Sequence, residues 1–143
     1  YIDVRDLAKF LVNCVEQGHM GAYNAVCNPR PWGGFLGATR DAVNPDTQMT
    51  WVPADFLAEH DVQPWSDVHL WADADSPMAG SLTWSADKAI AAGLTIRPAA
   101  ETARDTLAWF ETLPVERRSN LRAGMSPAKE AAVLAAWHER EGA

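Results

Sequence analysis

Three charged residues near the start of the chain stand where an α/β protein places a ligand. Asp3, Arg5 and Asp6 follow a short segment expected to be a strand, and they open the helix expected after it. Ligands in α/β proteins bind beyond the carboxyl ends of the strands. The functional interpretation is that these residues contact a substrate, for which Asp3 and Arg5 are the candidates, or form a hinge to a part of the protein outside this chain. The alternative, which these residue types favour, is helix capping with a local ion pair.

A second polar group follows the next expected strand. Asn28, Arg30 and Trp32 come after the short apolar run at residues 22–27. The guanidinium of Arg30 can form paired hydrogen bonds with a carboxylate or a phosphate. The three residues are therefore candidate substrate ligands, and the alternative is an arginine solvated on a loop.

Two of the seven tryptophans lie close together in the middle of the chain. Trp65, His69 and Trp71 fall in residues 61–82, a stretch without clear periodicity of the kind that often forms functional loops. The two indoles are candidates for lining an apolar substrate pocket, and His69 can titrate near pH 6.5. The alternative is that these side chains pack beneath a loop.

Composition and charge exclude several classes of partner. A net charge of −7 argues against nucleic acid or an anionic membrane as the main partner. No apolar run approaches the ~20 residues of a membrane-spanning helix. Cys14 and Cys27 are too few for a disulfide framework, and we expect both to be reduced in a cytoplasmic protein. The histidines lack ligand spacing with the cysteines, so no metal site is expected. Because the chain begins with Tyr1, we expect it to be processed or part of a longer protein.

The expected elements alternate between strands and helices. Strands are expected at residues 1–4, 22–27, 48–52 and 94–96, and helices at residues 4–17, 32–43, 53–60, 85–92, 98–112 and from 126 onward. Asp3 is the expected cap of the first helix, and Gly18 its expected end. Gly93 closes the fourth helix, and Ser126 with Pro127 opens the last.

Spacings of three and four residues predict which helix faces are buried. In the first helix the predicted inward face consists of Leu7, Phe10, Leu11, Cys14 and Val15. In the helix at 98–112 it consists of Ala99, Thr102, Ala103, Leu107 and Phe110.

Three segments carry a resemblance to a known family. Residues 1–8, Y-I-D-V-R-D-L-A, resemble the strand-to-helix junction of extended short-chain dehydrogenases/reductases, the NAD-dependent epimerase/dehydratase-like enzymes. Residues 21–25, G-A-Y-N-A, match that family's next strand at the expected spacing. Residues 85–109 resemble its closing pattern, with Gly93-Leu94 in place of Leu-Gly. The middle of the chain and Ser126, Pro127 and Trp137 are similar to a bacterial subgroup of such reductases.

The resemblance implies an α/β fold, the carboxy-terminal portion of a Rossmann-like enzyme with edge strands and a small α+β substrate-binding part. Residues 1–27 would be the last strand-helix-strand of the dinucleotide-binding sheet, residues 28–112 the substrate-binding part and residues 113–143 a helical tail. The chain would bind a small hydroxyl or carbonyl compound. NAD or NADP would bind to an amino-terminal cofactor-binding half that is missing here.

The catalytic parts of that family are not present in this sequence. Gly33, Gly34 and Gly37 do not have the spacing of the G-x-x-G-x-x-G turn that receives a pyrophosphate. No lysine has a tyrosine four residues before it, so the Tyr-x-x-x-Lys acid/base pair is absent. We therefore expect this chain alone to have no catalytic or cofactor-binding residues and to bind no cofactor. Two alternatives stay open, a non-enzymatic ligand-binding or protein-interaction domain and a proteolytic fragment.

Overall fold

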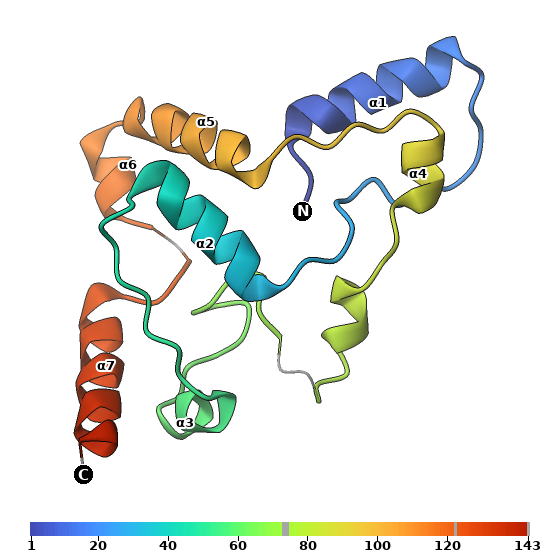
Figure 1. The fold of residues 1–143 in the computed structure, drawn as a ribbon. Helices are drawn as coiled ribbons and strands as arrows, with labels where there is room; N and C mark the ends of the chain where they lie inside the picture. The colour runs from blue at the N-terminus through green and yellow to red at the C-terminus, as the bar shows by residue number, and fades with distance from the viewer. Residues whose placement is uncertain (73–74, 122, 143) are drawn as a thin grey trace. The chain divides into compact units, whose positions relative to one another are not determined.

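The structure is a computed structural model that describes residues 1–72, 75–121 and 123–142. The described residues form seven α-helices and one short 3-10 helix, η1 (Ala79–Leu82), and contain no strand. The helices are α1 (Val4–Glu16), α2 (Trp32–Val43), α3 (Ala54–Glu59), α4 (Asp87–Ala91), α5 (Ala99–Glu111), α6 (Val115–Ser119) and α7 (Pro127–Glu141) (Figure 1).

The expected α/β fold with edge strands is therefore wrong. Residues 1–3 and 22–27 are joined by a backbone hydrogen bond from the Cys27 amide to the Tyr1 carbonyl, at 2.8 Å, but no ladder continues from it. A sheet needs a repeated series of such bonds. The other two segments expected to be strands, residues 48–52 and 94–96, are not strands in the structure. The only bridge among the described residues is an isolated one between Pro64 and Val68.

The helix boundaries agree closely with those expected from the sequence. At α1, α4 and α7 the residues predicted to begin or end the helix do so. The Asp3 carboxylate accepts the amide hydrogen of Arg5 at the start of α1, and Ser126 does the same for Lys129 at the start of α7. Gly18 and Gly93 have positive φ angles of 67° and 97°, which permit the chain to leave α1 and α4. The helix α6 and the 3-10 helix η1 are additional to those expected.

The chain divides into two compact units. Unit 1 comprises residues 1–46 and 80–112, and unit 2 comprises residues 47–79 and 113–143. The division predicted from the sequence, into residues 1–27, 28–112 and 113–143, separates parts by their function. The two compact units do not test it, and it stays a prediction.

Unit 1 has a small core at α1 and α4. Phe10, Ala89 and Leu94 are buried, and Tyr23 packs its ring edge-on against Phe10 with centroids 5.6 Å apart. Within the same unit α2 and α5 lie side by side (Figure 1). The predicted inward face of α1 is only half correct, because Phe10 and Cys14 face this core whereas Leu11 and Val15 are exposed.

Unit 2 has its own core. Phe56, Val62 and Val133 are buried together, and Trp137 of α7 lies edge-on to Phe56 with centroids 5.0 Å apart. Lys129 of α7 donates from Nζ to the Asp67 carboxylate and to the Asp61 carbonyl, at 2.6 and 2.8 Å. These bonds join the loop after α3 to the start of α7.

Candidate functional site

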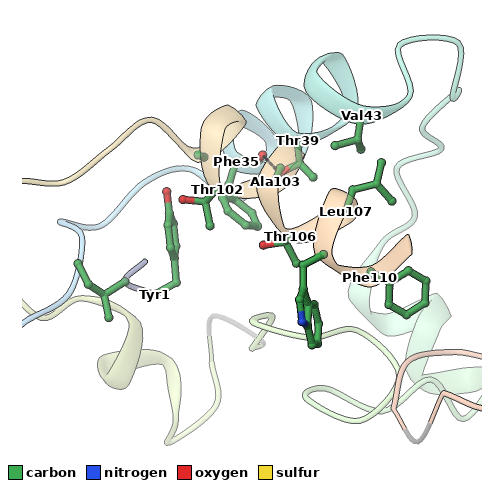
Figure 2. A pocket seen from close by; sticks show the side chains of 12 residues that line it. Tyr1, Phe35, Thr39, Val43, Thr102, Ala103, Thr106, Leu107 and Phe110 are labelled. Atoms are coloured by element: carbon green, nitrogen blue, oxygen red, sulfur yellow. Dashed lines mark hydrogen bonds between the residues drawn. The ribbon is translucent and has the colours of Figure 1, made fainter. Parts of the chain in front are cut away.

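A pocket of about 490 Å³ lies between α2 and α5, and we call it the α2–α5 pocket. From α2 it takes Phe35, Thr39 and Val43, and α5 supplies seven residues between Ala99 and Phe110. Tyr1 and Ile2 complete the lining (Figure 2). Its lining residues all belong to unit 1. The pocket is therefore a feature of one compact unit.

None of the side chains that line this pocket is charged. Its polar side chains are those of one tyrosine and three threonines. Two of the threonine hydroxyls are already used, because Thr39 donates to the Phe35 carbonyl and Thr102 donates to the Asp3 carboxylate. The remaining wall is aliphatic or aromatic, so the pocket suits an uncharged ligand.

The Tyr1 side chain lies against one aromatic neighbour and carries an unpaired hydroxyl. Its ring lies 5.2 Å from that of Phe35, centroid to centroid, and Trp32 stacks on Phe35 at 5.6 Å. The Tyr1 Oη atom is buried and has no hydrogen-bond partner among the described residues. Burial, more than the nearby Cys27, raises the pKa of Tyr1 above its ordinary value, against a smaller lowering by Arg30. The hydroxyl therefore stays protonated and can donate a hydrogen bond.

A cluster of charged side chains joins the start of α1 to the start of α5. Asp3 accepts hydrogen bonds from the backbone amide, Nε and Nη2 of Arg5, at 2.7 to 2.9 Å, as well as from Thr102. Arg5 also donates to Asp105. These bonds, led by those from the Arg5 side chain, hold the pKa of Asp3 well below its ordinary range. Asp3 is thus an ionised, buried helix cap.

Asp6 and Arg97 form the second half of this charge cluster. The Asp6 carboxylate accepts from the backbone amide, Nε and Nη2 of Arg97 at 2.8 to 3.0 Å, and Arg97 also pairs with Glu101. The hydrogen bonds from the Arg97 side chain lower the pKa of Asp6. Each of the two buried carboxylates is paired with a guanidinium, Asp3 with that of Arg5 and Asp6 with that of Arg97.

Asp3 and Arg5, two predicted substrate ligands, line a second pocket of about 560 Å³. The structure assigns both to capping and ion pairing, the alternative favoured by the residue types. A substrate contact for either one stays a prediction.

The next three predicted residues also fall in unit 1. Asn28 accepts the amide hydrogen of Ala86 and donates to the Asp87 carboxylate, so its side chain fastens the start of α4. Arg30 is exposed and makes no hydrogen bond or ion pair that the described residues reveal. Trp32 stacks against Phe35, which lines the α2–α5 pocket.

The last three predicted residues fall in unit 2. Trp65 adopts a left-handed backbone conformation with φ of 66°, and its carbonyl oxygen is bonded to Nδ1 of the exposed His69. Trp71 is partly buried. Residues 73–74 of the irregular stretch lie outside the described residues. The eight predicted site residues are thus divided between the two units, and no single unit contains them all.

The sequence did not predict the pocket, but it did predict the inward face of the helix that forms one of its walls. The face of α5 predicted to enter the core, from Ala99 to Phe110, lines the α2–α5 pocket instead. The signal was in the residue types, since Ala99, Thr102 and Ala103 are small and fill little space between helices. A face of alanine and threonine opposite Phe35 and Val43 leaves a hollow where larger side chains would have closed it.

Among residues 1–72, 75–121 and 123–142, no three side chains of the metal-binding types gather into a possible metal site. In the same ranges no helix has the length and apolar character needed to cross a bilayer. Comparisons with protein families, with curated proteins and with solved structures found no match for the chain.

Proposed function

We propose that the chain is the substrate-binding, carboxy-terminal portion of an NAD(P)-dependent epimerase/dehydratase-like oxidoreductase that acts on a small hydroxyl or carbonyl compound. The observation that carries the proposal is that the three segments resembling this family meet in unit 1. Asp6 in the first segment binds Arg97 in the third. In the second segment, Asn24 donates to the Ser85 carbonyl and the Ala22 carbonyl accepts from Lys88.

The α2–α5 pocket supports the class of ligand. Its volume lies within the roughly 300–1,000 Å³ of small-molecule sites. A wall without charged side chains matches a small compound whose polar groups are uncharged, such as hydroxyls or carbonyls. The pocket does not fit a dinucleotide, because it offers neither a charged side chain nor a Gly-rich turn to hold a pyrophosphate. NAD or NADP therefore belongs to the amino-terminal half in this proposal.

One observation supports docking of that amino-terminal half. Four apolar residues repeat at spacings of four, three and four along α1, and all are exposed: Val4, Ala8, Leu11 and Val15. Such a stripe of apolar side chains is the usual contact surface of a helix.

The proposal concerns the function and the partner of this chain. It does not include a β-sheet in the chain, because the described residues contain no strand. The exposed stripe on α1 also favours a second candidate, a non-enzymatic ligand-binding or protein-interaction domain that docks on another protein through this helix.

The test is the intact mass of the protein from its native source, with peptide sequencing upstream of Tyr1. The proposal expects a longer species whose upstream part carries a Gly-rich turn and a Tyr-x-x-x-Lys. A native species that begins at or near Tyr1 would overturn it and leave the interaction domain as the better explanation.

A further inference from the structure

Two pockets of unit 1 adjoin each other along α5. The second pocket, which we now call the α1–α5 pocket, is lined by the start of α1 and by α5. It shares four lining residues with the α2–α5 pocket: Ile2, Thr102, Thr106 and Trp109. Both linings belong wholly to unit 1. A ligand made of a ring and a short chain can therefore occupy both pockets at once.

The α2–α5 pocket suits the apolar end of such a ligand. Ala99 and Ala103 leave space on α5, and Phe35 and Phe110 add aromatic side chains to the lining. Two of the three threonine hydroxyls already donate hydrogen bonds within the protein. A charged group placed there would lose its hydration without gaining a partner of opposite charge. An uncharged ring matches this lining, because aromatic side chains pack well against other rings.

The α1–α5 pocket differs from its neighbour in charge. Two carboxylates and one guanidinium line it, those of Asp3, Asp105 and Arg5, which gives the lining a net charge of −1. The Arg5 guanidinium donates to both carboxylates, so its positive charge is already compensated. The Asp105 side chain is 49% exposed, and the described residues show one hydrogen bond to it, from Arg5. Its carboxylate can therefore accept a further hydrogen bond from a ligand.

The surroundings of the α1–α5 pocket also favour a cation over an anion. Next to it, Arg97 pairs with both Asp6 and Glu101, and this group carries a further net charge of −1. The exposed indole of Trp109 lines both pockets, and aromatic rings attract cations. A carboxylate or phosphate at this place would be repelled, whereas an ammonium group would be attracted.

We propose that the two pockets together bind an amphipathic amine, with an apolar ring in the α2–α5 pocket and a protonated amino group beside Asp105 in the α1–α5 pocket. The inference goes beyond the proposed function and does not depend on it, because both pockets lie within this chain. Asp105 is a binding residue in this proposal, and no chemical step is assigned to it. A protein segment that covers both pockets is the other occupant that the test distinguishes.

The first experiment compares three probes of similar size with the full chain at neutral pH. Phenethylamine is a cation, phenethyl alcohol is neutral and phenylacetate is an anion. Two-dimensional NMR titrations that follow the Trp109 indole and the amides of α5 give the dissociation constants. The amine is expected to bind roughly 2- to 5-fold more tightly than the alcohol, the effect of one exposed ion pair, and the anion more weakly than either. Because salt screens exposed charges, the advantage of the amine should shrink between about 20 and about 500 mM sodium chloride.

Two matched pairs of variants locate the two ends of the probe. Asp105→Asn should remove most of the advantage of the amine while leaving the affinity for the alcohol unchanged. Asp41→Asn is its control, because Asp41 is also an exposed carboxylate paired with an arginine and lines neither pocket. Ala103→Leu fills the α2–α5 pocket and should weaken all three probes. Ala108→Leu is its control on the same helix, because Ala108 is exposed and lines neither pocket.

The Asp105→Asn protein is expected to fold, since Asp105 is half exposed and Arg5 keeps its bonds to Asp3. An advantage of the amine that falls with salt and requires Asp105 but not Asp41 would sustain the inference. The inference is overturned if phenylacetate binds as tightly as phenethylamine, or if Asp105→Asn keeps the advantage. It is also overturned if none of the probes shifts the resonances of the lining residues, a result that would leave a protein segment as the occupant of these pockets.

Discussion

Asp6 and Arg97 stand 91 residues apart in the chain and are joined by three hydrogen bonds, one of them from the Arg97 backbone amide. Asp6 lies in the first turn of α1, and Arg97 immediately precedes the Pro98 that caps α5. The contact therefore sets where α5 begins relative to α1. Because α5 forms one wall of the α2–α5 pocket, this ion pair also positions the candidate site.

Removing the Asp6 carboxylate should destabilise unit 1. Asp6→Ala leaves the Arg97 amide and guanidinium without their main acceptor, and we expect the free energy of unfolding to fall by about 2 kcal/mol. Urea unfolding measures the change. Asp41→Ala is the control, since Asp41 pairs with Arg40 at an exposed position, and it should cost less than ~0.5 kcal/mol. Equal losses in the two variants would contradict this account of the charge cluster.

The same carboxylates make stability depend on pH at the acid end. Hydrogen bonds from Arg5 and Arg97 lower the pKa values of Asp3 and Asp6 in the folded protein. The unfolded chain has values near 3.9. The ion pairs therefore contribute stability that is fully present above the unfolded pKa and is lost as the pH falls through the folded values.

We expect a level free energy of unfolding down to about pH 5 and a steep fall below about pH 4. Urea unfolding at a series of pH values measures the curve. Asp6→Ala should show a shallower fall in the acid range, since it lacks one of the two contributing groups. A fall of unchanged size in that variant would assign the acid sensitivity to other residues.

Gly93 is a position where a methyl group should not be tolerated. Its φ angle is 97°, and a Cβ atom built there would lie 2.8 Å from Nδ2 of Asn13. That nitrogen donates to the Ala92 carbonyl and joins α1 to the end of α4. Gly93→Ala should therefore lower the free energy of unfolding by about 1–3 kcal/mol.

The control for this substitution is Gly37→Ala. Gly37 lies inside α2 with open space at its Cβ position, so alanine there should be neutral or stabilising by up to about 1 kcal/mol. Thermal unfolding of both variants gives the comparison. A Gly93→Ala protein as stable as Gly37→Ala would show that the turn after α4 adapts.

Substitution of two neighbouring residues of α1 should change the free energy of unfolding by very different amounts. Phe10 is buried against Ala89 and Leu94, and Phe10→Ala should cost about 3 kcal/mol or more. Leu11 is 57% exposed, and Leu11→Ser should change the stability of this chain by less than ~0.5 kcal/mol. Denaturant unfolding compares them. A large loss in Leu11→Ser would mean that the apolar stripe of α1 is covered within this chain.

The helices could be predicted because their end signals are local. Asp3 and Ser126 satisfy amides only two or three residues away, and Gly18 and Gly93 supply the positive φ angles that end α1 and α4. Each of these signals acts over one turn. The sequence around a helix end therefore contains enough to specify it.

The strands could not be predicted in the same way because pairing is not local. The segments at residues 1–4 and 22–27 have the apolar composition of strands, yet each would need partners for its backbone groups along its whole length. In the described part of the chain a single backbone hydrogen bond, from the Cys27 amide to the Tyr1 carbonyl, joins these segments. Composition indicates that a segment can be extended and does not show whether another segment lies beside it.

The candidate site was predicted only in part for a similar reason. Periodicity indicated which face of α5 turns inward, but it could not distinguish a packed face from a hollow one. That depends on what α2 presents opposite it, and the match between Thr102 and Ala103 on one helix and Phe35 on the other is a tertiary property. The predicted ligands Asp3 and Asn28 are instead occupied by capping and by fastening α4.

The interleaving of the two units in the chain has a consequence during synthesis. Unit 1 is complete once residue 112 has left the ribosome, whereas residues 47–79 must wait for residues 113–143. Until then Phe56 and Val62 lack the covering side chains of α7, Val133 and Trp137. A nascent or prematurely terminated chain would present that early segment to chaperones and proteases while its first unit was already folded.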